Sequence, residues 1–273
     1  MTDRDFQAIS NLALTSAGLS FSKEKRPMIR SRLANRIRVL QLSSFSEYCD
    51  ILRQKNAVRE RQHMISALTT NVTRFFREPH HFDLLRQKVL PPLVASLRKG
   101  ESVRIWSAGC SKGQEAYSIG MTLLDLAPDA ASLDVKILAT DIDPNVVRTG
   151  HNGCYQIPEM AEISSGQRLK YFKYHDPPSI NEMTVRNRLR RIVRFRELNL
   201  INNWPMKKHF DVIFCRNVLI YFDAHARLCL LPRFEAANTA DGWLFLGHAE
   251  KLPAGSQTTY ESAGVTAYRR YSV

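Results

Sequence analysis

The sequence of 273 residues lacks the long apolar runs that cross a membrane. No run of about 18 or more apolar residues occurs, so we expect no transmembrane helix. Met1 to Leu12 carry charges at Asp3 and Asp5 and lack an apolar core, so no signal peptide is expected. The five cysteines are scattered without a CxxC pair, and the isolated histidines show no metal-binding spacing, so we expect neither a disulfide framework nor a bound metal. A cytoplasmic location is the resulting expectation.

Acidic residues are scarce relative to basic ones. The chain has 26 Asp and Glu against 39 Lys and Arg, which gives a formal net charge of +13. The basic excess is concentrated in residues 23–38 and 168–196. This charge favours an acidic partner, such as nucleic acid, an anionic membrane surface or an acidic protein, and does not choose among them.

Two familiar nucleotide-binding signatures are also missing. After a strand expected at 103–107, Gly109 and Gly113 stand in a GxxxG spacing, which is neither the GxGxxG of dinucleotide folds nor a P-loop, so a nucleoside triphosphate is disfavoured. Asp141 ends the next expected strand, where a carboxylate can accept both hydroxyls of a ribose. Asp143, which precedes a proline, is expected to cap a helix. A glycine turn and an acid about 30 residues apart indicate an adenosine cofactor.

Apolar spacing divides the chain into a helical beginning and an alternating remainder. In the first ~80 residues, Ile29, Leu33, Ile37 and Leu40 form one helical stripe, and no strand pattern precedes Val103. Strand and helix patterns alternate from there on, which predicts a mostly parallel sheet with helices on both faces. We expect strands at 103–107, 135–140, 192–198, 210–215 and 243–246, helices at 115–126 and 224–237, and an antiparallel edge hairpin at 258–260 and 266–271.

Residues 150–192 interrupt this alternation. The segment is too long for a simple connection, so we expect an inserted subdomain beside the sheet. The predicted organisation is therefore a helical N-terminal domain at 1–85 and an α/β domain at 86–273 that contains the insert.

Several sequence runs point to one family. They are Leu-Thr-Thr-Asn-Val-Thr-Arg-Phe-Phe-Arg-Glu at 68–78, Phe-Arg-Glu-Leu-Asn-Leu at 195–200, Phe-Asp-Val-Ile-Phe-Cys-Arg-Asn-Val-Leu-Ile-Tyr-Phe at 210–222, and Gly-His-Ala-Glu at 247–250. In type and order, over essentially the whole chain, they resemble the CheR-type chemotaxis receptor methyltransferases. The resemblance implies a class I, Rossmann-like methyltransferase fold with an antiparallel edge hairpin, a small all-helical N-terminal domain and a small inserted β-subdomain.

The resemblance also implies roles for individual residues. S-adenosylmethionine is the implied cofactor, with Glu115 holding the ammonium of its methionine part and Asp141 its ribose. Arg77 and Tyr221 would lie nearest the transferring methyl group. The further residues implied to line the cofactor pocket are Asn71, Thr73, Gly109, Asn199, Leu200, Asn217 and Val218. This chain departs from the family's usual STGEEPYS run at Lys112, Gln114 and Ala116, which puts cofactor affinity in question.

The implied reaction is methyl transfer to glutamate side chains on the cytoplasmic domains of methyl-accepting chemotaxis receptors, with S-adenosylhomocysteine as the product and no metal. By the same analogy, the acceptor segments are acidic helices. Four basic residues flank the apolar stripe of the N-terminal helix and are the expected docking residues. They are Arg30, Arg32, Arg36 and Arg38. The basic segment 168–196 is the next docking candidate.

Two other functions stay open at this point. A nucleic-acid methyltransferase would suit the charge, but amino-methylating enzymes usually carry [DN]PP[YFW] where this chain has Cys215-Arg-Asn-Val. The proline pair Pro177-Pro178 lies in the insert, where we expect a turn, and Cys215 has no preceding proline and is expected to be a buried core residue. A module that binds the cofactor without catalysis is supported only by Lys112 and Gln114.

Overall fold

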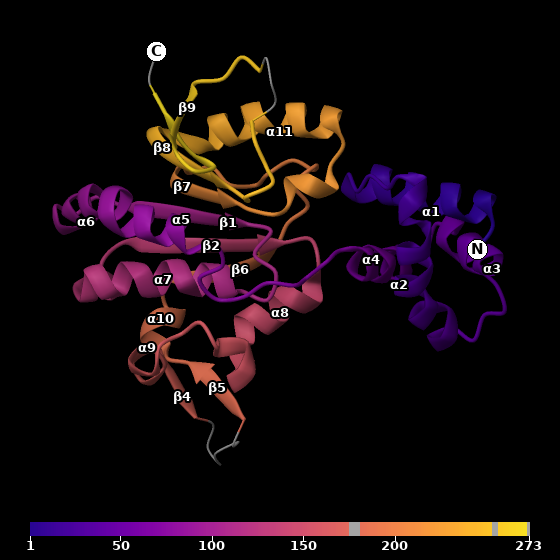
Figure 1. Cartoon of the computed structure of the whole chain (residues 1–273), viewed down its shortest axis with the longest axis horizontal. Helices are drawn as coiled ribbons and strands as arrows, with labels where there is room; N and C mark the ends of the chain where they lie inside the picture. Colours follow the sequence, from indigo (N-terminus) through magenta and orange to yellow (C-terminus); the bar gives the residue numbers. More distant parts are fainter. Residues whose placement is uncertain (175–180, 253–255, 272–273) are drawn as a thin grey trace.

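The computed structural model describes residues 1–174, 181–252 and 256–271. Its centre is a seven-stranded sheet with the strand order β6-β2-β1-β7-β8-β10-β9 (Figure 1). The strands are β1 (Val103–Ala108), β2 (Val135–Asp141), β6 (Val193–Glu197), β7 (Phe210–Cys215), β8 (Asn238–Leu246), β9 (Tyr260–Gly264) and β10 (Ala267–Arg270). The first five run parallel, and β10 is antiparallel to both β8 and β9. The predicted parallel sheet with an antiparallel edge hairpin is confirmed.

The strand order reverses between β1 and β7. From β1 the chain adds β2 and β6 on one side, then crosses back to add β7 and β8 on the other. In open α/β sheets, ligands bind in the crevice beyond the carboxyl ends of the strands at such a reversal. The topology alone therefore locates a binding site after Ala108 and Cys215.

Helices cover both faces of the sheet, because successive strand residues point to opposite faces. On β1, Ile105 packs on the side of α5–α7, whereas Trp106 packs on the opposite side against Phe234 of α11. The helices of this domain are α5 (Pro79–Leu84), a π-helical turn η2 (Leu85–Val89), α6 (Leu90–Arg98), α7 (Gln114–Leu126), α8 (Pro144–Asn152) and α11 (Ala224–Ala237). Phe82 and Leu85 belong to the core of the sheet, although the sequence groups them with the helical N-terminus.

The N-terminal helices form a separate bundle beside the sheet, in indigo in Figure 1. They are α1 (Asp3–Ala17), α2 (Arg26–Val39), α3 (Phe45–Arg53) and α4 (Val58–Leu68), with a short 3-10 turn at Lys23–Lys25. Ile29 and Leu33 of the predicted stripe are fully buried in the bundle core. Two polar contacts tie α4 to the sheet domain, because Gln62 donates to the Ile142 carbonyl at 2.8 Å and Ser66 donates to Asp143 at 2.8 Å. They fix the segment that runs from α4 to α5 across the end of the sheet.

The predicted insert is a small subdomain with its own antiparallel sheet, in the order β3-β5-β4. It contains β3 (Cys154–Gln156), a 3-10 turn η4 (Ile157–Met160), α9 (Ser165–Tyr171), β4 (Phe172–Tyr174), β5 (Glu182–Val185) and α10 (Asn187–Arg190). Tyr155 donates a hydrogen bond of 2.7 Å to the Lys112 carbonyl, which joins the insert to the turn after β1. The turn expected at Pro177-Pro178 lies outside the described residues.

The first strand of the C-terminal hairpin differs from the prediction in its bounds. The strand is Tyr260–Gly264 rather than 258–260. The Thr258 hydroxyl and the Thr259 N–H donate instead to the Glu235 carboxylate of α11. Of the helices in the described ranges, none is both long and apolar enough to span a bilayer.

Candidate active site

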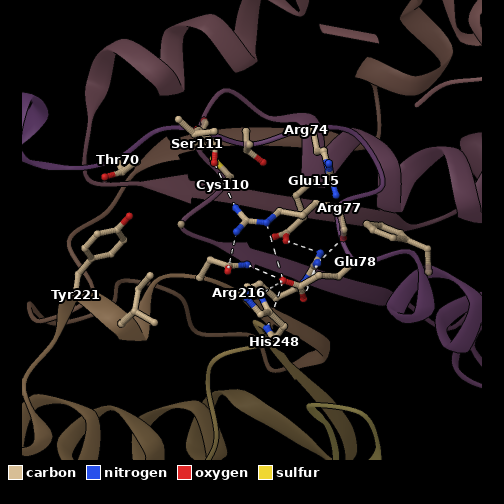
Figure 2. Close-up of a pocket in the computed structure, with 16 residues that line it drawn as sticks. Thr70, Arg74, Arg77, Glu78, Cys110, Ser111, Glu115, Arg216, Tyr221 and His248 are labelled. Carbon is tan, nitrogen blue, oxygen red and sulfur yellow. Dashed lines mark hydrogen bonds and ion pairs between the residues drawn. The ribbon is translucent and has the colours of Figure 1, made fainter. Parts of the chain in front are cut away.

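Two adjoining cavities lie at the predicted switch point. The larger has a volume of about 570 Å³ and the narrower about 80 Å³. The larger is walled by the segment from α4 to α5, by the turns after β1 and β7, and by the turn after β8 (Figure 2). Five residues line both cavities, namely Thr70, Gly109, Ser111, Asn217 and Tyr221. The two spaces therefore meet at the turns that follow β1 and β7.

Every residue predicted to bind the cofactor or to act in catalysis lines one of these cavities. Thr73, Arg77 and Glu115 line the larger one. The narrower cavity is lined by Asn71, Asp141, Asn199, Leu200 and Val218, and Gly109, Asn217 and Tyr221 face both. The structure thus brings together residues from six separate parts of the chain.

The turn after β1 allows the closest backbone approach in the site. Gly109 has φ +82°, and a Cβ atom there would lie 2.2 Å from Cγ2 of Val218. The Gly109 N–H donates to the Thr140 carbonyl at 2.8 Å, so the turn is fixed to the end of β2. Any side chain at Gly109 would fill the space between the two turns, as expected of a glycine that admits a ligand.

Asp141 and Asp143 have different hydrogen-bond partners. Asp141 is buried and accepts the backbone N–H groups of Ser111 at 2.8 Å and of Asp143 at 3.0 Å. Burial raises the pKa of Asp141 to about 6 despite these hydrogen bonds. Asp143 caps α8 through the Asn145 N–H at 3.0 Å, which confirms its predicted structural role. It also accepts the Asn71 amide at 2.9 Å.

A buried arginine organises the floor of the larger cavity. Arg216 lies 3.0 Å from Glu78 and 3.1 Å from Glu115, and it also donates to the Arg77 carbonyl (Figure 2). Its guanidinium lies 5.6 Å from the ring centre of Phe82. Because this cation is shared by two carboxylates and an aromatic face, it fixes the segment before α5 against the turn after β7.

The pKa values of Glu115 and Glu78 are shifted in opposite directions. Burial raises the pKa of Glu115, and the charge of Arg216 and a 2.7 Å hydrogen bond from Ser107 offset only part of that effect. Burial would also raise the pKa of Glu78, but the charge of Arg216 and hydrogen bonds from Asn217, Arg216 and His248 lower it to about 2. Glu78 is therefore a fixed anion, whereas Glu115 is stabilised by any further cation that enters the cavity.

The Arg77 side chain is held in the wall of the larger cavity by a hydrogen bond to Asn217. Its guanidinium donates to Asn217 Oδ1 at 2.9 Å, and the Asn217 amide donates in turn to Glu78 at 3.1 Å. About a third of the Arg77 side chain is exposed to the cavity and solvent. A cation held in this way is available to a second carboxylate that enters from outside.

The turn after β7 is held by a carboxylate from the turn after β8. Asn217 has φ +60°, an uncommon conformation for a residue with a side chain. Glu250 is buried and accepts three backbone N–H groups, from Gly247 at 2.6 Å, Asn217 at 2.8 Å and Ile220 at 3.1 Å. A Cβ atom on Gly247 would lie 2.7 Å from the Asn217 nitrogen and 2.8 Å from Oε2 of Glu250, so a glycine is needed where the two turns meet.

The four arginines expected to dock substrate do not share one environment. Arg32 bonds to the Leu68 carbonyl and to Thr70, each at 2.5 Å, and Arg36 pairs with Glu60 at 2.5 Å. Arg30 and Arg38 are exposed. Two of the four thus hold the helical bundle and the start of the site segment, and none of them lines either cavity.

Sequence reasoning gave no role to Arg216, Glu78 or Glu250. All three stand inside the runs that carry the family resemblance, which was the available signal. Their contacts join positions more than 30 residues apart, so no local pattern reveals them. Cys215, by contrast, is fully buried as predicted.

One side-chain group has the spacing of a metal site within the described ranges. Ligand atoms of Glu78, His80 and His81 lie within 4.8 Å of one another. Glu78 is already paired with Arg216, and His81 Nε2 donates to the Val265 carbonyl at 2.9 Å. Burial and the nearby charge of Arg216 lower the pKa of His81 to about 4, and the same charge disfavours a metal cation there.

The strand order, with its reversal beside two joined cavities and its antiparallel seventh strand, is that of the class I S-adenosylmethionine-dependent methyltransferases. Comparison with known proteins specifies the family. The chain matches "CheR methyltransferase, SAM binding domain" over residues 71–269 and "CheR methyltransferase, all-alpha domain" over residues 4–69. It belongs to the CheR methyltransferase family and is an S-adenosylmethionine-dependent methyltransferase.

Relatives match along nearly the whole chain. A probable chemotaxis protein methyltransferase of Rhizobium etli is 42% identical over 255 residues, covering 93% of this chain and 95% of the relative. Chemotaxis protein methyltransferase 2 of Pseudomonas aeruginosa is 36% identical, covering 98% of this chain and 93% of that protein. The chemotaxis protein methyltransferase of Escherichia coli is 39% identical, covering 92% and 86%.

Proposed function

We propose that this methyltransferase esterifies glutamate side chains on the cytoplasmic domains of methyl-accepting chemotaxis receptors. The observation that carries the proposal is the pair of joined cavities in a chain of this family. The narrower one suits an adenosine, and the larger one is lined by a cation, Arg77, that can receive a carboxylate side chain. The names of the relatives, all chemotaxis protein methyltransferases, support the receptor as substrate.

The donor groups in the cavities fit S-adenosylmethionine. Asp141 is a buried acceptor suited to ribose hydroxyls, and Leu200 and Val218 offer apolar walls for a base. Glu115 is a buried carboxylate that gains from a second cation such as an amino-acid ammonium. Lys112, which departs from the family run, forms a 3.4 Å ion pair with Glu159 of the insert, so its charge is directed away from the cofactor residues.

The proposed reaction requires that the acceptor carboxylate and the methyl group be positioned, and it requires no proton transfer. Bound S-adenosylmethionine supplies an electrophilic methyl group and leaves as a neutral thioether. A glutamate side chain, with an ordinary pKa near 4.3, is already ionised at neutral pH, so neither a general base nor a metal is needed. Holding the reacting groups in line can supply roughly 7–11 kcal/mol in favourable systems.

Arg77 and Tyr221 are the proposed positioning groups for the acceptor. Arg77 donates to Asn217 from one terminal nitrogen and to the Val72 carbonyl from the other, and each nitrogen keeps a further N–H for a carboxylate. Tyr221 lines both cavities, at the place where the methyl group would pass. The contact has to be loose, because a carboxylate bound too tightly in the ground state would react more slowly.

The direct test is transfer of a tritiated methyl group from S-adenosylmethionine to receptor-rich membranes. We expect label on receptor protein that is released as methanol by mild base, because methyl esters hydrolyse and N-methyl groups do not. Label that survives base would contradict ester formation, and label on added DNA or RNA would favour the nucleic-acid alternative. Cofactor binding without any transfer would favour the inactive module. A chelator should leave the transfer rate unchanged.

A further inference from the structure

A third cavity lies at the free edge of the seven-stranded sheet. Its volume is about 630 Å³, and among the described residues it shares no lining residue with the two active-site cavities. It forms where the edge strand β6 meets α8 and α10, which lie below β6 in Figure 1. We call it the arginine cavity. Its lining includes His151, Asn187, Arg190, Arg191, Arg194 and Arg196.

The four arginines carry positive charge that the described part of the chain does not neutralise. No carboxylate among those residues lines the cavity or pairs with any of the four. Arg190 donates instead to the His151 carbonyl at 2.9 Å. Arg194 and Arg196 each donate to the carbonyl of the residue before them, at 3.0 and 2.7 Å. Arg104 of β1, by contrast, donates to both oxygens of an aspartate. A carbonyl is a dipole without net charge, so the charge of the cavity stays unbalanced.

The cavity is a preformed structure. Arg190 joins α10 to the end of α8, and Arg194 of β6 also donates to the Arg190 carbonyl at 3.4 Å. Phe195, which forms part of the wall, is buried, and a Cβ atom on Gly150 would lie 2.4 Å from its ring. Guanidinium groups held close together repel one another. A bound anion relieves this repulsion at little cost in side-chain ordering.

We infer that the arginine cavity binds a small anion with two or more phosphate groups. The inference goes beyond the proposed methylation and does not depend on it. A planar guanidinium matches two oxygens of one phosphate, which makes arginine suited to phosphate recognition. A single carboxylate would balance only one of the four charges, so the cavity fits a ligand of higher charge. The neutral amide of Asn187 can both donate and accept, and it suits the uncharged part of such a ligand.

The shape of the site favours a small molecule over a membrane surface or a nucleic acid. Its volume lies within the ~300–1,000 Å³ that is typical of small-molecule sites. The charges converge on one concave space from α10 and β6, whereas an extended basic face is the usual footprint of nucleic-acid binding. Free oligophosphates, nucleotides and phosphorylated lipid headgroups share the required chemistry.

Calorimetry with inorganic triphosphate tests the inference on the whole chain. S-adenosylhomocysteine is present throughout, so that the cofactor site is occupied. We expect one triphosphate per chain, with inorganic monophosphate at least about tenfold weaker, because it engages fewer guanidinium groups. Arg191→Gln combined with Arg194→Gln should weaken triphosphate binding roughly tenfold or more. Lysine at both positions should recover only part of this loss, because an ammonium keeps the charge without the planar fork.

Arg4→Gln combined with Arg59→Gln is the matched control. Both arginines are exposed, lie in the helical bundle and line none of the three cavities, and the pair makes the same change in net charge. Triphosphate affinity should stay within about twofold of the parent, because salt screens charges outside the cavity. Equal affinity for S-adenosylhomocysteine in the parent and in both double variants verifies that the fold is kept.

Vesicles that contain a phosphorylated inositol lipid separate the two sources of phosphate. Vesicle binding that triphosphate displaces and that Arg191→Gln with Arg194→Gln weakens would identify a lipid headgroup. Triphosphate binding without vesicle binding would identify a soluble ligand, and both results support the inference.

Three results would overturn it: no triphosphate binding by the parent, equal affinities for monophosphate and triphosphate, or equal losses in the control pair. Tighter binding of a single-stranded oligonucleotide at the same arginines would assign the cavity to nucleic acid instead. No receptor is present in these measurements, so failure of the receptor methylation assay would count against the proposed function alone.

Discussion

Asp141 is the residue expected to set how cofactor binding depends on pH. Burial raises its pKa to about 6, so the protonated carboxyl stabilises the cofactor-free fold relative to the unfolded chain. That stabilisation is fully present below about pH 3.8 and is lost as pH rises through 6. Ribose hydroxyls donate to the ionised form, so bound cofactor favours the carboxylate. We therefore expect the affinity for S-adenosylmethionine to fall as pH drops below about 6 and to level off above it. Calorimetry between about pH 5 and 7.5 measures this.

Asp141→Asn is the matched control for that titration. It keeps the shape of the side chain but replaces an acceptor oxygen with an amide donor that faces backbone N–H groups. We expect weaker binding at pH 7 and a flatter pH profile, with any remaining slope assigned to Glu115, whose pKa is also raised. The same slope in the parent and in the variant would remove Asp141 from the ribose role.

Arg77 is expected to act on turnover more than on cofactor affinity. Arg77→Ala removes a cation that lines the larger cavity while leaving Glu115 and Asp141 in place. We expect kcat on receptor substrate to fall by about 10²-fold or more, in the range that a lost positioning contact costs, with a much smaller change in the dissociation constant of S-adenosylhomocysteine. Single-turnover kinetics and calorimetry check the two quantities. An unchanged kcat would exclude a catalytic role for Arg77.

The site residues that could be identified from the sequence are those whose positions follow from a local sequence pattern. Gly109 and Asp141 follow predicted strands, and Asp143 precedes a proline at a helix start, so their places follow from turn and capping chemistry. Arg216 follows no such pattern. Its position depends on Glu78 and Glu115, which come from elements that only the folded sheet brings together. The family resemblance included the sequence run that contains Arg216, but it did not reveal that Arg216 pairs with Glu78 and Glu115.

At the scale of elements, the turns after β7 and β8 are expected to move as one unit through Glu250. Glu250→Gln leaves one acceptor oxygen and turns the other into a donor that faces a backbone N–H. We expect a loss of about 1–3 kcal/mol in the free energy of unfolding, because a buried hydrogen bond is replaced by a clash of donors. The kcat should fall as well, since Asn217 holds Arg77.

Denaturant unfolding and receptor methylation rates test this prediction. Glu261→Gln on β9 changes an exposed carboxylate in the same way and should leave both quantities unchanged. If Glu250→Gln matched it, the carboxylate would not be what holds the two turns.

Strands were easier to predict than their ends. The central strands are buried on both faces and appear as short apolar runs, so β1 and β7 were found to within a residue. Strand β8 begins at Asn238, five residues before its apolar core, and β9 begins two residues after its predicted start. The later start of β9 follows from the contact of Thr259 with Glu235 of α11. The earlier start of β8 follows from the pairing of Asn238 with Phe210 of β7. A pattern within one strand contains neither contact.

At the scale of the whole molecule, the division into a helical bundle and a sheet with an insert followed from the change in apolar period near Val103. How the bundle meets the sheet did not. Part of that contact is made by Gln62, Ser66 and Asn71, three polar side chains that bond to the loop after β2. The rest includes the bonds of Ser16 to Asn199 and of Ser20 to Tyr221. Polar contacts between domains leave no periodic trace in sequence. Helix α2 lies in the bundle beside the sheet domain (Figure 1), and one of its faces, with Arg30 and Arg38, is exposed.

That face is where we expect receptor docking by charge, and the structure separates its four arginines into two kinds. Arg32 and Arg36 are engaged inside the protein, so reversing them would also disturb the bundle and the site segment. Arg30 and Arg38 are exposed and free of that complication. The informative variant is therefore the double reversal Arg30→Glu with Arg38→Glu.

This double reversal should raise KM for receptor about two- to tenfold at low salt, since each exposed pair is worth only about 0.2–1 kcal/mol. The salt dependence of KM should flatten, because fewer charges remain to be screened over the ~10 Å that applies near 0.1 M salt. Affinity for S-adenosylmethionine should be unchanged, as neither residue lines either active-site cavity. Lys88→Glu with Lys99→Glu makes the same change in net charge near α6, at the far side of the sheet from the bundle (Figure 1). If the two double variants had equal effects on KM, α2 would act only through net charge. If neither variant changed KM, electrostatic docking at α2 would be excluded, and residues 168–196 would remain as the basic candidate.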